Sequence, residues 1–378
     1  MTKHIEILSY IAYNYYRDFG YNTERLGCII WNKLELLMAR KKTYKFIDLF
    51  AGCGGLSLGL EQAGFTPWFV NELVETFCNT YKKNHNLSDD HYFIGDINEL
   101  NQHIDDYQNY LTDITLVCGG PPCQGFSMAN RQRILDDPRN QLYKAYLYFL
   151  KSVRPLFFVM ENVKGMSNKI DEIKQNFKDY LGDDYLFDYR LLKAQDFGVP
   201  QNRERFIMIG NRVGITPSEI FDTINKYKCK PFVLRDALQG LPHLGAKKVK
   251  GAKDVENEES GFTEKDFIYP NTAFYRFING NKKIYKLYNH KNRYNNPRDI
   301  EIYKRLPQGA NSLHPSIEDI MPYKSRNGIF KDKYFKLNEN EICKTITSHM
   351  KHDCNMYIHP TQSRGLSPRE AARVQTFP

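Results

Sequence analysis

The segment KFIDLFAGCGG, residues 45–55, decides the fold. Its first half is an apolar run that predicts a buried strand. Glycines at 52, 54 and 55 then turn the chain into a helix whose leucines lie at 56, 58 and 60. Glycines in such a turn let a ligand approach the backbone closely and expose the amides at the start of the helix. The segment therefore predicts a strand, a ligand-binding turn and a helix.

The same alternation of short apolar runs and helical patterns continues along the chain. The clearest helix, Gln141–Val153, has an apolar face and a cap near Asn140. The expected strands are Tyr44–Phe50, Trp68–Val70, Tyr92–Ile94, Ile114–Val117, Leu156–Met160 and Arg205–Ile209. This order predicts an α/β fold with a mainly parallel, doubly wound sheet.

Three regions differ in composition. Residues 1–43 form a preface in which Ile5, Leu8, Ile11, Ala12 and Tyr15 recur at helical spacing. Residues 44–231 hold the strand–helix alternation, and we expect them to form a catalytic, cofactor-binding domain. Residues 232–378 are rich in Lys, Arg, Asn and Tyr, and we expect a smaller, irregular domain there. Any single charge cluster in it could equally be ordinary solvated surface.

Composition limits the class of protein. A chain of 378 residues can bury a sizeable core, and its net charge of +9 hints at a polyanionic partner. The N-terminus lacks a signal-peptide pattern and no segment has the apolarity of a membrane span, so we expect a cytosolic protein. The eight cysteines form no disulfide framework or CxxC pattern, so we expect no metal site.

Acidic residues follow the next two expected strands. Glu72 comes about twenty residues after the glycine turn, where an acid can bind the two ribose hydroxyls of a nucleoside. Asp96 follows the third strand and is placed to accept from an adenine amino group. A glycine turn alone is often only a tight turn, but the two acids favour a nucleoside cofactor. FAGCGG lacks the GxGxxG spacing, so S-adenosylmethionine fits better than a pyrophosphate cofactor.

A cysteine in an unusual place suggests the reaction. In GGPPCQGFS, residues 119–127, Cys123 follows an expected strand end, and the two prolines before it stiffen the turn. A stiff, exposed thiol beside a cofactor cleft is a candidate nucleophile. Glu161 ends another buried strand, as a site acid or equally as a capping or ion-paired residue. Arg203 and Arg205 alternate before a strand, so both project to one face.

Taken in order, these segments resemble the DNA (cytosine-5) methyltransferase family of bacterial restriction–modification systems. The matching segments are Phe50–Gly54, Glu72, Gly95–Asp96, the Pro-Pro-Cys-Gln turn, Asp137–Leu142, Glu161–Val163, Gln201–Arg205 and RGLSPREAARVQTFP. The resemblance covers Tyr44 to about Cys229 and resumes at Arg364. The region between, including KTITSHM, is similar more loosely to target-recognition regions.

The resemblance implies both a reaction and site residues. Cys123 would add to C6 of a flipped-out cytosine, Glu161 would hold and protonate N3, and Arg205, with Arg203 behind it, would lie near O2. The implied cofactor-binding residues are Asp48, Phe50, Gly52, Gly54, Leu56, Glu72, Asp96, Ile97, Pro122 and Leu142. The implied contacts to duplex DNA are Gln124, Ser127, Arg131 and Arg133, in a loop that closes over the base, and Thr345 and Thr347.

One family feature is missing. The last motif, a Gly-Asn-rich turn and helix that closes the cofactor pocket, does not follow Pro378. A fragment, a second polypeptide carrying that motif, or replacement by residues 1–43 would each account for this. Two other functions also remain open: methylation of cytosine in tRNA, and a DNA-binding chain that is catalytically incomplete. A cognate restriction endonuclease is expected in the same system without necessary contact.

Overall fold

The structure is a computed structural model of the chain, and it describes residues 43–122, 142–247, 256–280, 282–322, 333–351 and 354–378. Backbone contacts divide these residues into two units. The first unit runs to Leu192 and includes Glu204–Lys226, and the second comprises Lys193–Arg203 and Tyr227–Pro378. The segment Lys193–Arg203, which the sequence suggested for the first domain, therefore packs within the second unit.

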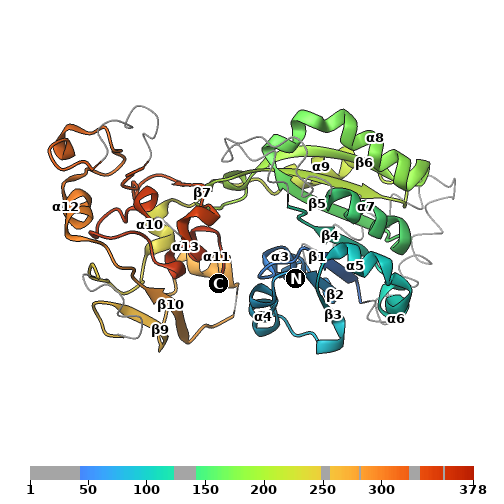
Figure 1. Cartoon of the computed structure of the whole chain (residues 1–378), viewed down its shortest axis with the longest axis horizontal. Coiled ribbons are helices and arrows are strands. Elements are labelled where there is room, and N and C mark those ends of the chain that lie inside the picture. The colour runs from blue at the N-terminus through green and yellow to red at the C-terminus, as the bar shows by residue number, and fades with distance from the viewer. Residues whose placement is uncertain (1–42, 123–141, 248–255, 281, 323–332, 352–353) are drawn as a thin grey trace, which may run out of the picture. The chain divides into compact units, whose positions relative to one another are not determined.

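A seven-stranded sheet forms the centre of the first unit (Figure 1). Its strand order is β3-β2-β1-β4-β5-β8-β6, with parallel pairing from β3 to β5 and antiparallel pairing of β5 with β8. The strands are β1 (Lys45–Leu49), β2 (Thr66–Glu72), β3 (Tyr92–Ile94), β4 (Leu116–Gly119), β5 (Phe157–Val163), β6 (Leu186–Lys193) and β8 (Glu204–Asn211). The predicted fold class and all six expected strands are confirmed.

Alternating side chains give this sheet two buried faces. Ile47 and Leu49 of β1 pack in the main core together with residues of α5, α7 and α8, whereas Phe46 packs in a smaller cluster that Leu56 and Leu60 of α3 cover. This is the period of two expected for a strand buried on both faces. The helices are α3 (Gly55–Gln62), α4 (Glu75–Asn84), α5 (Ile97–Gln102), α6 (Gln108–Leu111), α7 (Leu142–Val153), α8 (Ile170–Leu181) and α9 (Pro217–Asn225).

Strand β6 is the element of this sheet that the sequence did not predict. It lies at the sheet edge, where Phe187, Tyr189 and Leu191 are partly buried against the core and charged residues stand between them. An edge strand exposed on one side shows alternation instead of a continuous apolar run. The sequence of β6 therefore lacks the continuous apolar run that marks the buried strands.

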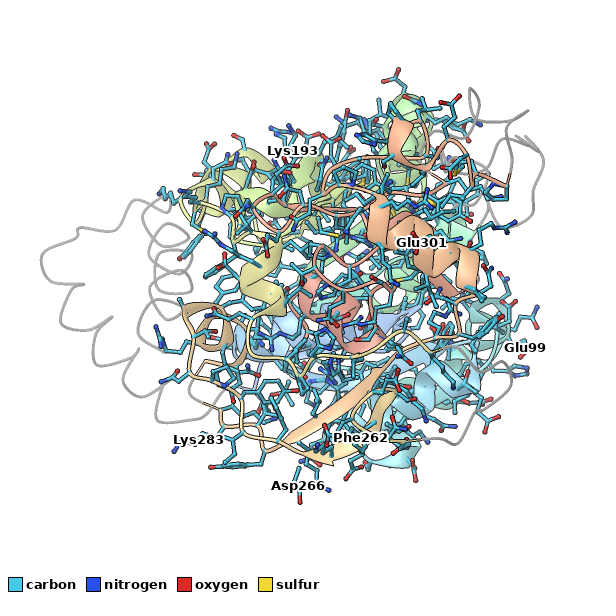
Figure 2. The ribbon with its side chains drawn as sticks, turned by 90° about the vertical axis from the view of Figure 1, so that its left-hand side faces the viewer. Glu99, Lys193, Phe262, Asp266, Lys283 and Glu301 are labelled. Atoms are coloured by element: carbon cyan, nitrogen blue, oxygen red, sulfur yellow. The ribbon has the colours of Figure 1, made fainter. Side chains whose placement is uncertain are left out.

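The second unit has short elements and more irregular chain. Strands β9 and β10 pair antiparallel, although α11 lies between them in the chain, and Figure 2 labels Phe262 and Asp266 on β9. Strand β7 pairs in parallel with β11. The elements are β7 (Gln201–Asn202), α10 (Leu234–Leu238), β9 (Gly261–Asp266), α11 (Ala273–Asn279), β10 (Lys286–Lys291), α12 (Pro297–Arg305), β11 (Cys343–Lys344) and α13 (Pro368–Val374).

A buried ion pair fixes the start of α13. Glu370 is 1% exposed and accepts from Arg364, which is 0% exposed, through two bonds of 2.7 Å each. The same carboxylate accepts from the backbone N–H of Ser367, whose hydroxyl in turn caps the helix. Burial raises the pKa of Glu370, but the charge and hydrogen bonds of Arg364 outweigh burial and lower that pKa to about 2. The motif RGLSPRE therefore has a structural role: its buried ion pair fixes the start of α13.

Among the described residues, none of the helices combines the length and the apolarity required to cross a bilayer.

Candidate active site

The glycine turn needs its glycines. Gly52 and Gly54 both have positive φ, at 58° and 83°, and Gly54 is the N-cap of α3. A Cβ atom on Gly54 would lie 2.2 Å from Nε2 of His85 and 2.8 Å from the ring of Tyr81. Both backbone conformation and space therefore restrict position 54 to glycine.

Asp48 lies beneath this turn. It is 1% exposed, and its Oδ2 accepts from the Ser57 hydroxyl at 2.6 Å, while Tyr81 donates to Ser57 at 2.7 Å. Burial raises the pKa of Asp48 to about 7, although the hydrogen bond from Ser57 opposes the rise. The sequence suggested Asp48 as a cofactor-binding residue, and its observed hydrogen bond is to Ser57 of α3.

Glu72 holds the turn from the neighbouring strand. Its Oε2 accepts from the backbone N–H of Gly52 at 2.7 Å, and its Oε1 accepts from Val74 N–H at 2.8 Å. Asp96, after β3, caps α5 by accepting from Asn98 N–H at 2.7 Å. The two predicted carboxylates thus follow adjacent strands at the carboxyl edge of the sheet, where open α/β sheets bind ligands.

The other residues suggested for the cofactor differ in exposure. Ile97 is 2% exposed and belongs to the main core, and Phe50, Leu56 and Leu142 are partly buried against hydrophobic clusters. Pro122 is exposed. Of this group, Pro122 is the residue whose side chain has most room to contact a ligand.

Two predicted catalytic side chains meet at the ends of β5 and β8. Nε of Arg205 lies 2.9 Å from Oε1 of Glu161, and the side chains are 22% and 32% exposed. The other carboxylate oxygen faces Gly120, since a Cβ atom there would lie 3.3 Å away. A partly buried carboxylate and guanidinium held together in this way can hydrogen-bond a polar ring from one side.

Asn162 ties this pair to the proline turn. It is 4% exposed, and its Nδ2 donates to the carbonyl of Pro121 at 2.9 Å, bridging β5 to the turn after β4. We gave Asn162 no role from the sequence. An amide side chain directly after Glu161, at the end of an apolar strand, was the sequence signal that could have identified it.

The remaining predicted residues fall in two groups. Arg203 belongs to the second unit, where its carbonyl accepts from Ala194 N–H at 2.8 Å. Thr345 donates to the carbonyl of Asn202, and the Thr347 hydroxyl lies 3.1 Å from that of Tyr357. Cys123, Gln124, Ser127, Arg131 and Arg133 lie outside the described residues.

Comparison with known proteins gives a consistent family. The profile of the C-5 cytosine-specific DNA methylase family matches residues 44–378. The Type II methyltransferase M1.HphI of Haemophilus parahaemolyticus is 32% identical over 346 residues, which cover 88% of this chain and 77% of the relative. The Type II methyltransferase M.DdeI of Desulfomicrobium norvegicum is 29% identical over 351 residues, covering 88% and 78%.

A solved structure extends the similarity to the fold. The crystal structure of a protein described as a DNA modification methyltransferase encoded within a prophage (E. coli) aligns with a TM-score of 0.66 and 27% identity. The alignment covers 89% of each chain, so it includes parts of both units.

Proposed function

Because the chain belongs to the C-5 cytosine-specific DNA methylase family and is a DNA cytosine-5 methyltransferase of the restriction–modification type, we propose that its reaction takes place where β4, β5 and β8 bring the proline turn, Glu161 and Arg205 together. The observation that carries this location is the 2.9 Å ion pair between Arg205 and Glu161. The hydrogen bond from Asn162 to the carbonyl of Pro121 supports it, because it joins the residue after Glu161 to the turn that leads to Cys123.

In the proposed reaction Cys123 is the nucleophile. Its thiolate forms a bond to C6 of cytosine, and the electron pair of the 5,6 double bond moves to C5, which becomes enamine-like. Glu161, after taking up a proton, donates it to N3 and so disperses the charge that addition creates. Arg205 hydrogen-bonds O2, and Arg203 assists it. After methylation at C5, a base such as solvent water takes the C5 proton, the C–H electron pair re-forms the 5,6 double bond as the thiolate leaves C6, and N3 returns its proton to Glu161.

We propose S-adenosylmethionine as the methyl donor, which would supply an electrophilic methyl group on a sulfonium. The donor set supports this choice: Glu72 and Asp96 offer carboxylates at adjacent strand ends, and the turn FAGCGG carries no lysine or arginine for a phosphate. Glu72 would accept from the ribose hydroxyls and Asp96 from the adenine amino group. Gly52, Gly54 and Pro122 would face the cofactor, Phe50, Leu56, Ile97 and Leu142 would shape its surroundings, and Asp48 would fix the loop from below.

The substrate base has to leave its duplex before this site can reach it, which costs a few kcal/mol of unstacking. We assign this step to residues 124–137, with Gln124, Ser127, Arg131 and Arg133 contacting DNA. The second unit would read the sequence, with Thr345 and Thr347 among its DNA contacts. We propose that the same system contains a restriction endonuclease that needs no contact with this chain.

The test is covalent trapping. Bisulfite sequencing of DNA from a methylation-free host that expresses the chain identifies the target site, and a duplex with 5-fluorocytosine at that site then retains the adduct, because no C5 proton can leave. With cofactor present, we expect a denaturation-resistant complex linked at Cys123.

Matched cysteine variants make the result specific. Cys123→Ala should abolish the adduct and lower turnover by more than about a thousandfold, a barrier change of at least ~4 kcal/mol. Cys229→Ala removes an exposed thiol of the second unit and should leave trapping unchanged. An adduct on any other residue would overturn the assignment of Cys123.

A further inference from the structure

The second unit has an exposed basic loop between α11 and β10. Its residues 282–285 are Lys-Lys-Ile-Tyr, and we call them the lysine loop. Lys282 and Lys283, the latter labelled in Figure 2, are exposed, and Tyr285 is 62% exposed, whereas Ile284 is partly buried. Four consecutive residues span at most about 14 Å, so the three exposed side chains belong to one local surface.

Hydrogen bonds to the backbone hold the lysine loop in place. The hydroxyl of Tyr275, on α11, donates to the carbonyl of Lys282 at 3.3 Å and accepts from the N–H of Ile284 at 2.8 Å. At the other end, Phe267 N–H donates to the carbonyl of Tyr285 at 2.9 Å. The loop therefore presents its exposed side chains from a preorganised backbone.

The charges of the lysine loop are not neutralised by neighbouring acids. The lysines of β9 and β10 have carboxylate partners: Lys265 pairs with Glu258, Lys286 with Glu264 and Lys291 with Glu256. Asp266, at the end of β9, stands opposite Lys286 in register. Among the described residues, no carboxylate forms an ion pair with Lys282 or Lys283. Two adjacent positive charges thus remain uncompensated at this end of the β9–β10 ladder.

We propose that the lysine loop binds the phosphate backbone of the duplex. The ammonium groups of Lys282 and Lys283 would each neutralise a phosphate, and the hydroxyl of Tyr285 would donate to a phosphate oxygen beside them. Such contacts fix a protein on the duplex without reading its bases. The inference rests on the proposed role of the second unit in reading DNA, and it names a part of that unit that would hold the backbone.

The chemistry of the loop favours a phosphate backbone over another protein. Neighbouring like charges repel, and an anion placed between them relieves that repulsion. Lysine is depleted from the cores of protein interfaces, whereas binding to DNA gains free energy from each phosphate that a lysine neutralises. The chain as a whole has a net charge of +9, so the loop adds to a field that already attracts polyanions.

The salt dependence of DNA binding tests the proposal. Fluorescence anisotropy of a labelled duplex gives Kd at several salt concentrations, and each phosphate contact contributes about 0.9 to the slope of log affinity against log salt. Lys282→Gln/Lys283→Gln should make that slope less negative by about 1.8 and weaken binding at least about tenfold near 0.1 M salt. A duplex without the target site should show the same change, because phosphate contacts carry no sequence information.

A matched double variant controls for the loss of charge. Lys304 and Arg305 are likewise adjacent in the second unit, but they pair with Glu301 and Asp319. Lys304→Gln/Arg305→Gln removes the same charge and should leave the slope within about 0.5 of the parent value, because ion-paired side chains release no counterions from DNA. An unchanged slope for the lysine loop variant, or an equal change in the control, would overturn the proposal.

Tyr285→Phe tests the uncharged contact. It should weaken binding about three- to tenfold, the usual loss for one hydrogen bond, and leave the salt slope unchanged because no charge is removed. An unaltered affinity would overturn the assignment of Tyr285. None of these measurements requires methyl transfer. If covalent trapping failed while the lysine loop variant still changed the slope, the proposed reaction would be wrong and the backbone contact would stand.

Discussion

Glu161 and Arg205 illustrate how a strand end can hold a reactive pair. They come from neighbouring antiparallel strands, and a second ion pair, Lys164 with Glu204 at 2.8 Å, lies close by: Glu204 precedes Arg205, and Lys164 is three residues after Glu161. The two pairs therefore share their location and interaction type. They differ in proposed role, because Glu161 and Arg205 would contact the cytosine and Lys164 and Glu204 would not.

This contrast gives a matched kinetic prediction. Arg205→Ala should lower kcat by about 10²–10³-fold, the usual loss for one charge-stabilising donor at a reacting centre. Lys164→Ala removes the neighbouring exposed ion pair and should change kcat by less than about threefold. Single-turnover methylation of the mapped duplex measures both. Equal effects would mean that Arg205 only supports the local structure.

Gly54 gives a second prediction at this scale. Gly54→Ala should destabilise the first unit by more than the ~1–2 kcal/mol that a positive φ alone costs, because the new methyl group meets His85 and Tyr81. Gly64→Ala is the control: Gly64 has a φ of 91°, but a Cβ atom there has nothing within 4 Å. Urea unfolding measures both losses. A loss for Gly54→Ala no greater than the control would show that the turn can shift.

Asp48 makes stability depend on pH. Its pKa rises from 3.8 to about 7 on folding, because burial disfavours the charged carboxylate. The folded protein therefore binds the proton more tightly, and the contribution of Asp48 is largest below its unfolded pKa and lost as pH rises through about 7.

Asp48→Asn isolates this effect. The free energy of unfolding of the parent minus that of the variant should decrease from about pH 5 to about pH 8. His359, whose pKa burial lowers to about 4, contributes to both proteins and cancels. Denaturant titrations at each pH measure the difference. A difference independent of pH would contradict a raised pKa for Asp48.

At the scale of single elements, α9 and α13 begin in the same way. Each has a capping box, formed by Thr216 and Glu219 in α9 and by Ser367 and Glu370 in α13. The α9 box is exposed, whereas the α13 glutamate is buried and also binds Arg364. The same local sequence signal is therefore an exposed helix cap in α9, whereas in α13 it is a buried cap that also forms an ion pair.

The two caps should respond differently to neutralisation. Glu370→Gln leaves Arg364 buried without a compensating charge and should destabilise the second unit by about 3–5 kcal/mol. Glu219→Gln should cost less than about 1 kcal/mol. Hydrogen exchange of the backbone amides in α13 and in α9 measures the loss of stability at each helix. If Glu370→Gln cost no more stability than Glu219→Gln, the buried ion pair would not be what stabilises the start of α13.

For the whole molecule, the sequence predicted six of the seven strands of the main sheet and the positions of Glu72 and Asp96 at strand ends. Apolar runs and the acids that follow them are local signals, so they can be read from the sequence. It did not predict that Asp48 would accept a hydrogen bond from Ser57, that Asn162 would donate one to the carbonyl of Pro121, or that Ile97 would lie in the core. Those facts depend on which strands become neighbours and on the side chains that fill the space between them. Strand β6 was missed because an edge strand needs no continuous apolar run.

The pairing of β7 with β11 has a practical consequence for engineering. These strands bring residues 201–202 and 343–344 together inside the second unit, although the stretch containing β7 interrupts the first unit in the sequence. Exchanging only the C-terminal part with that of a relative would join a foreign β11 to a native β7. A chimaera that exchanges the whole second unit, to test its proposed role in reading DNA, should therefore be assembled from two inserts, residues 193–203 and 227–378, taken from the same donor.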